Sequence, residues 1–76
     1  MYTVEQFEKA ILALNKPITL LEVKIFKGNR VRQFIGSYEG RRVVWQASGE
    51  ALIGNNVVPE LKVNPADYGQ LTRTNR

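Results

Sequence analysis

Apolar residues in the first segment of the chain recur at helical spacing. These positions are Val4, Phe7, Ile11 and Leu14. Steps of three or four residues would align them as one stripe on a helix. Thr3 and Gln6 have the spacing of a capping box, while Tyr2 and Phe7 are placed for a hydrophobic staple. Because Pro17 blocks continuation, the pattern predicts a helix over residues 3–14.

Three strand-like runs follow, over residues 18–27, 30–38 and 41–48. Gly28-Asn29 and Glu39-Gly40 separate these runs, and both dipeptides favour tight hairpin turns. The turns place Val23 opposite Phe34 and Phe34 opposite Trp45, and they also pair Ile25 with Arg32 and Leu21 with Gly36. Period-two alternation then predicts the face that the helix covers. Its residues are Leu21, Val23, Ile25, Phe34, Tyr38, Val43, Trp45 and Ala47.

The opposite face of this predicted sheet mixes apolar and polar side chains. A solvated sheet face alternates more strictly, and an apolar band with a polar frame is typical of an interface. We therefore expect a protein interface on this face. Its residues are Phe26, Val31, Gln33, Ile35, Val44 and Gln46. The alternative is that the apolar residues after Gly49 fold across the same face.

The pattern is weaker after Gly49. Residues 50–53 have the pattern of a single helical turn, and residues 57–63 that of a fourth strand, which Pro59 confines to an edge. We expect one domain over residues 1–64 and a polar, flexible tail over residues 65–76. The predicted fold class is α+β, an N-terminal helix packed on a three- to four-stranded antiparallel β-meander. A small half-open β-barrel is the alternative, if the fourth strand pairs with the first.

Composition narrows the chemistry. The 76 residues include no cysteine and no histidine, which removes thiolate nucleophiles, disulfides and the commonest acid–base group and metal ligand. The carboxylates are scattered, and the glycines do not have the spacing of a phosphate-binding loop. We expect no catalytic residues, no metal ligands and no cofactor, and hence a protein that is not an enzyme.

The net charge of +4 is concentrated in the middle of the chain, where residues 15–48 hold seven basic and two acidic side chains. Six of these basic residues lie on or beside the predicted turns: Lys24, Lys27, Arg30, Arg32, Arg41 and Arg42. They would form two clusters roughly 20–25 Å apart, at opposite ends of the second strand. Arg32 would share the helix-covered face and extend to solvent beyond it. These residues favour an alternative function, sequence-tolerant binding of DNA or RNA.

The sequence thus predicts a small interaction module whose partner is another protein or a second copy of the chain. Chains of this size bury roughly 60% of their unfolded surface and often gain stability by pairing. No apolar run approaches the roughly 20 residues of a membrane span. No targeting segment is recognisable at the N-terminus, where Glu5 and Glu8 stand in place of a basic region. We expect a cytoplasmic protein without membrane contact.

Overall fold

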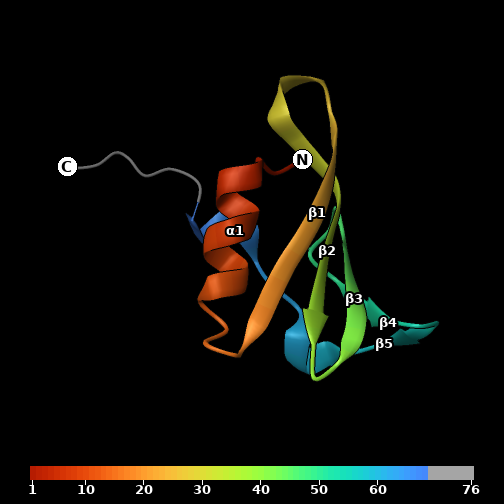
Figure 1. Cartoon of the computed structure of the whole chain (residues 1–76). Coiled ribbons are helices and arrows are strands. Elements are labelled where there is room, and N and C mark those ends of the chain that lie inside the picture. Colours follow the sequence, from red (N-terminus) through yellow and green to blue (C-terminus); the bar gives the residue numbers. More distant parts are fainter. Residues whose placement is uncertain (69–76) are drawn as a thin grey trace.

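The computed structural model describes residues 1–68, which form one α-helix and an antiparallel sheet of five strands (Figure 1). The strands lie in the sheet in their chain order, from β1 to β5. The predicted α+β meander is therefore confirmed, with five strands instead of three or four. The barrel alternative is wrong, because β1 and β5 are opposite edges of an open sheet.

The helix α1 spans Val4–Leu12. The strands are β1 (Ile18–Phe26), β2 (Arg30–Tyr38), β3 (Arg41–Gln46), β4 (Ala51–Ile53) and β5 (Asn56–Val57). Three short 3₁₀-helices complete the described chain: η1 (Lys27–Asn29), η2 (Pro59–Leu61) and η3 (Pro65–Tyr68).

The start of α1 has the predicted capping chemistry. The Thr3 hydroxyl accepts a hydrogen bond from the Gln6 backbone N–H at 3.2 Å, and the Gln6 side-chain oxygen accepts one from the Thr3 N–H at 2.8 Å. The Tyr2 and Phe7 rings lie 6.2 Å apart, as a staple requires. The Val31 N–H also donates to the Tyr2 carbonyl at 2.8 Å, which joins the start of the helix to β2.

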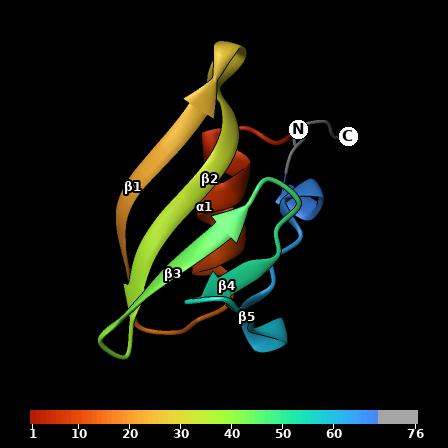
Figure 2. The same cartoon turned by 90° about the vertical axis from the view of Figure 1, so that its right-hand side faces the viewer.

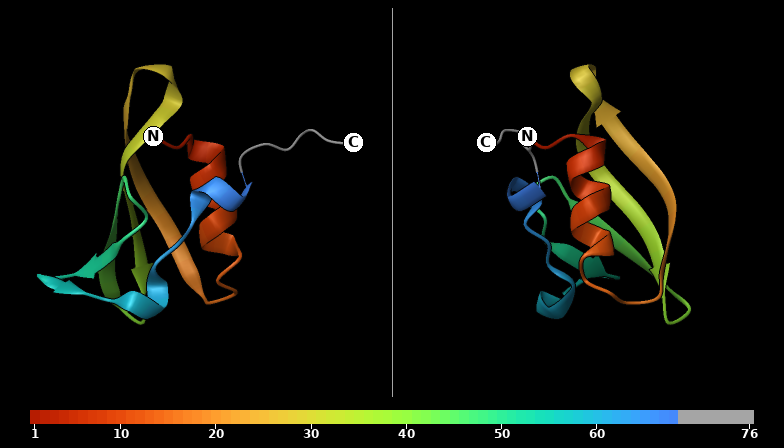
Figure 3. Two further views of the ribbon diagram at one scale, coloured as in Figure 1. Left: turned by 180° about the vertical axis from the view of Figure 1, so that it is seen from behind. Right: turned by 90° about the vertical axis from the view of Figure 1, so that its left-hand side faces the viewer.

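The core lies between α1 and one face of the sheet. The Phe7 ring stacks on the Phe34 ring with a centroid distance of 6.1 Å. Trp45 is fully buried, and its indole N–H donates to the Leu61 carbonyl at 2.8 Å. Leu61 and Val63 are themselves buried in this core, and Figure 3 shows their segment running beside α1. The described C-terminal segment therefore packs on the helix side of the sheet and not across its outer face.

The second hairpin turn has the predicted geometry. Glu39 and Gly40 both have positive φ angles, 53° and 74°, as a tight turn between twisted strands requires. The register that follows from this turn pairs Phe34 with Trp45 and Gly36 with Val43. Both pairs were predicted, so the β2–β3 register is confirmed.

The first hairpin differs from the prediction because its loop is one residue longer. Phe26 lies opposite Arg30, with η1 between them. An irregularity at Arg32 then restores the predicted pair of Val23 with Phe34. A second irregularity at Leu21 shifts the register again. An unpaired residue of this kind changes which face its neighbours occupy.

These shifts correct the predicted faces of β1 and β2. Ile25 pairs with Val31 and not with Arg32, while Gly36 pairs with Leu20 and not with Leu21. Val31, predicted on the outer face, is fully buried in the core. Leu21 and Ile25, predicted in the core, are 57% and 50% exposed. Ile25 is the next-to-last residue of β1, and this end of the β1–β2 hairpin extends past α1 (Figure 1).

The segment after Gly49 also differs from the prediction. Ala51–Ile53 is strand β4 and not a helical turn, because it pairs with β3. Only Asn56–Val57 of the expected fourth-strand region is extended in the sheet, and a 3₁₀-helix begins at Pro59. Pro65 is buried and η3 packs on α1, so the first four residues of the expected tail belong to the packed domain. The rest of that tail, residues 69–76, lies outside the described residues.

Candidate interaction surface

An apolar row crosses the outer face of the sheet, opposite the helix. Ile35 pairs with Val44, Val44 with Leu52, and Leu52 with Val57. Opposite residues of neighbouring strands point to the same face, so these four side chains form one continuous line over β2, β3, β4 and β5. On β1 the line ends at Glu22, which pairs with Ile35.

The exposure of this row increases toward β5. Ile35 is 3% exposed, Val44 and Leu52 are half-buried, and Val57 is 51% exposed. The Arg42 guanidinium lies 4.0 Å from the Glu22 carboxylate, and these residues belong to the strands on either side of β2. Their pair therefore passes over β2 beside Ile35 and shields it. The accessible part of the row lies on β3, β4 and β5.

Polar side chains border the row on both sides. Gln33 pairs with Gln46 on one side, and Ser37 pairs with Arg42 on the other. Both glutamines are half-buried. An apolar centre with a polar border is the usual arrangement of a protein-binding patch.

The structure brings four of the six predicted interface residues together. Gln33, Ile35, Val44 and Gln46 share the outer face. Phe26 is 43% exposed but lies apart from them, where β1 meets η1. Val31 is on the other side of the sheet, in the core.

Leu52 and Val57 belong to the row, and the sequence pattern did not assign them to it. β4 has three residues and β5 has two, which is too short for period-two alternation to be recognisable. The apolar character of Val57 was visible in the sequence, but its face is determined by pairing with Leu52.

Four of the six predicted basic residues gather at the η1 end of the first hairpin: Lys24, Lys27, Arg30 and Arg32. The Arg30 guanidinium donates to the Met1 carbonyl at 2.9 Å. The central carbon of the Arg32 guanidinium lies 5.6 Å from the centre of the Phe26 ring, a distance typical of a cation–π contact. Arg32 is thus exposed beside Phe26, and it does not share the helix-covered face.

Arg41 and Arg42 lie at the other end of β2, beside the Glu39-Gly40 turn. Both are exposed, and Arg42 is partly neutralised by Glu22. The larger cluster of free positive charge is therefore at the end of the first hairpin.

A groove of about 290 Å³ runs between α1 and β1. Its lining residues are Glu8, Leu20, Leu21, Glu22, Val23 and Phe34. The groove lies along the edge strand, so it continues the exposed apolar surface of β1.

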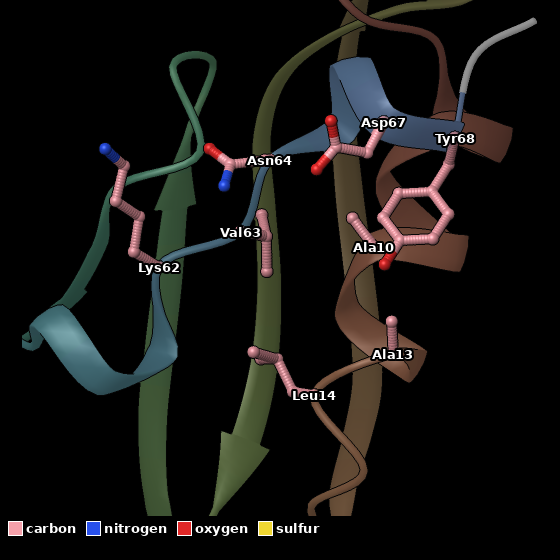
Figure 4. Close-up of a pocket in the computed structure, with 8 residues that line it drawn as sticks. All are labelled: Ala10, Ala13, Leu14, Lys62, Val63, Asn64, Asp67 and Tyr68. Atoms are coloured by element: carbon pink, nitrogen blue, oxygen red, sulfur yellow. The ribbon is translucent and has the colours of Figure 1, made fainter.

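A smaller pocket of about 160 Å³ lies between α1 and η3 (Figure 4). Its lining residues are Ala10, Ala13, Leu14, Lys62, Val63, Asn64, Asp67 and Tyr68. Ligand sites for drug-sized molecules are roughly 300–1,000 Å³, so this pocket is below that range. The Lys62 ammonium lies on the far side of the pocket from the Asp67 carboxylate in Figure 4, and the polar groups do not converge on one point.

Within residues 1–68 the structure has no group of three or more acidic side chains placed to hold a metal ion. That part of the chain also has no helix long and apolar enough to cross a membrane. Comparisons with models of known protein families, with curated proteins and with solved structures found no match for this chain.

Proposed function

We propose that this protein is a small, non-catalytic interaction module that contacts another protein, or a second copy of itself, through the outer face of its sheet. The observation that carries this proposal is the apolar row of Ile35, Val44, Leu52 and Val57. The accessible end of the row has no cover from the described C-terminal segment, which packs on the other face.

The dimensions of the row suit the centre of an interface. Neighbouring strands lie roughly 4.8 Å apart, so a row over four strands is about 14 Å long. Apolar area removed from water contributes roughly 25 cal/mol per Å². A partner that covers Val44, Leu52 and Val57 would gain this contribution, while Gln33 and Gln46 would form part of a hydrogen-bonding rim.

Changing Val57 to glutamate should weaken partner binding or self-association by about tenfold or more, because a charge would be buried among the apolar side chains of the contact. Val57 is 51% exposed, so this change should leave the fold intact. Ile35 is unsuitable as a probe, since it is 3% exposed and a charge there would destabilise the monomer. Sedimentation over a range of protein concentrations, with affinity capture from a cell extract, measures the effect.

Leu12→Glu is the matched control, because Leu12 is 69% exposed on α1, away from the outer face. The control should behave like the unchanged protein in both assays. If Val57→Glu and Leu12→Glu give the same masses and capture the same proteins as the unchanged protein, the outer face is not the contact surface.

The end of the first hairpin favours nucleic-acid binding as a second candidate function. Residues 23–38 contain four basic side chains and no acidic one. The hairpin extends past α1 (Figure 1), and Phe26 is 43% exposed beside Arg32. Proteins that bind single-stranded nucleic acid usually combine basic side chains, which contact phosphates, with an aromatic ring on which a base stacks.

For this candidate, Lys27→Gln and Arg32→Gln should each reduce the salt dependence of oligonucleotide binding. Each lost phosphate contact lowers the log–log salt slope by about one. Titration of mixed-sequence single-stranded and duplex oligonucleotides at two salt concentrations measures the slope. Arg41→Gln, at the opposite end of β2, is the control. An absence of binding at low salt would exclude this function.

A further inference from the structure

The strand β1 is an unpaired edge of the sheet. Its nine residues would extend roughly 30 Å at 3.3 Å per residue. Within residues 1–68 it pairs with β2 alone, and Figure 2 shows it running along the outside of the sheet. A long edge strand presents a row of free backbone N–H and C=O groups that can pair with another strand.

Exposed apolar side chains are concentrated on this edge. Leu21, Ile25 and Phe26 are 57%, 50% and 43% exposed. The groove between α1 and β1 lies beside them. Edge strands that avoid pairing are usually very short, or carry charges, proline or β-bulges. β1 has nine residues, and beyond its irregularity at Leu21 the charged side chains of the strand are Glu22 and Lys24.

These two charges suit antiparallel pairing of β1 with β1 of a second copy. Glu22 and Lys24 lie on the same face of the sheet, since their partners on β2 are Ile35 and Gln33. A two-fold axis at Val23 would place Glu22 of each copy opposite Lys24 of the other. Such a pairing forms two attractive charge pairs within the regular stretch of β1 that follows Leu21.

The neighbouring symmetric registers are unfavourable. In an antiparallel pair, residues directly opposite each other point to the same face of the sheet. A symmetric dimer can therefore change its register only by moving the two-fold axis from one residue to the next. An axis at Glu22 would place the two Glu22 carboxylates opposite each other, and an axis at Lys24 would do the same with two ammonium groups. Like charges directly opposite destabilise a sheet. The register centred on Val23 is therefore selected by charge.

We propose that two copies of this chain pair through β1, antiparallel and centred on Val23, into one continuous ten-stranded sheet. This pairing uses the sheet edge, so it does not depend on the outer-face contact proposed above.

Charge exchange tests this register directly. Glu22→Lys and Lys24→Glu should each weaken dimerisation about tenfold or more, because each change turns two attractive pairs into two repulsive ones. The double variant should recover the dimer, since it restores both pairs with the net charge unchanged. A mixture of the two single variants should form a heterodimer for the same reason. Sedimentation and light scattering would follow the mass from 8.6 kDa toward twice that value.

The controls separate this pairing from other causes. Lys62→Glu changes the net charge as Lys24→Glu does, at an exposed site away from β1, and should leave the dimer unchanged. The fold should survive Glu22→Lys, because the Glu22–Arg42 pair is exposed on both sides, at 51% and 67%, and such pairs contribute little. Val57→Glu should not affect an edge dimer, which distinguishes it from a dimer formed through the outer face.

Hydrogen exchange gives a second readout that needs no variant. Alternate β1 amides should become more protected as the protein concentration rises. A mass of 8.6 kDa at all concentrations up to millimolar would overturn the proposal. The proposal would also fail if neither Glu22→Lys nor Lys24→Glu weakened the dimer, or if a mixture of these two variants did not form a heterodimer. It would fail as well if the β1 amides were protected only when a different protein was added.

Discussion

Replacing Trp45 by alanine is expected to unfold the protein at room temperature. Trp45 is fully buried at the centre of the core, and its indole N–H donates to the Leu61 carbonyl at 2.8 Å. Truncating a buried tryptophan costs about 3–5 kcal/mol, and a carbonyl left without a donor costs about 1–3 kcal/mol more. A chain of this size has a free energy of unfolding of only about 5 kcal/mol. Far-UV circular dichroism, which does not depend on tryptophan fluorescence, measures the loss.

Trp45→Phe separates the two contributions. Phenylalanine retains much of the apolar volume but does not donate to Leu61, so the expected loss is about 1–3 kcal/mol with the fold retained. Thermal unfolding of Trp45→Phe and of the unchanged protein measures this loss. If Trp45→Ala still unfolds cooperatively within a few degrees of the unchanged protein, the link between β3 and the C-terminal segment is not what stabilises this fold.

The second large effect is expected at Gly49, which lies in the turn after β3 and contacts Val63 of the C-terminal segment. Its φ angle is +98°, and a Cβ atom there would overlap with the Val63 carbonyl oxygen. The Gly49 carbonyl accepts a hydrogen bond from the Val63 N–H at 3.0 Å. Gly49→Ala combines a strained backbone with displacement of this contact, so it should lower the free energy of unfolding by at least about 2–4 kcal/mol. Urea unfolding followed by fluorescence of the intact Trp45 measures this change.

Gly54→Ala is the matched control for this experiment. Gly54 also has a positive φ angle, +63°, but a Cβ atom there would meet nothing within 4 Å. Its replacement should therefore cost only the backbone strain, about 1–2 kcal/mol. Equal losses at Gly49 and Gly54 would show that the close approach to Val63 contributes no stability.

The two proposed surfaces can be examined in one set of variants. The outer row is most accessible at Val57 on β5, while the pairing edge is β1 at the opposite side of the sheet. Because three strands separate β1 from β5, a change at one edge should leave the other unaltered. The Val57→Glu variant and the exchange of Glu22 with Lys24 therefore report on different contacts.

The features predicted correctly from the sequence are those that depend on residues close together along the chain. The capping box joins Thr3 and Gln6, three residues apart. The second hairpin depends on Glu39-Gly40, whose positive φ angles set the register between Phe34 and Trp45. The outer-face position of Ile35 and Val44 follows from the same turn.

The incorrect face assignments in β1 and β2 share one physical cause, the single-residue irregularities between these two strands. The alternation of apolar and polar residues does not predict the extra residue in the first loop or the unpaired Arg32. Together these two features place Val31 in the core. The candidate surface therefore does not include Val31, and Phe26 lies apart from it beside η1. It gained Leu52 and Val57, whose strands are too short to have a recognisable pattern of their own.

By itself, the sequence determined the capped helix, the meander and the aromatic centre of the core, because local hydrogen bonds and apolar spacing specify them. The tertiary structure determined the face that Val31 occupies, the packing of the segment after Gly49 and the open edges of the sheet at β1 and β5. These outcomes depend on contacts between distant residues, such as Trp45 with Leu61. Such contacts are selected by the free energy of the whole core, in which no single segment's pattern is decisive.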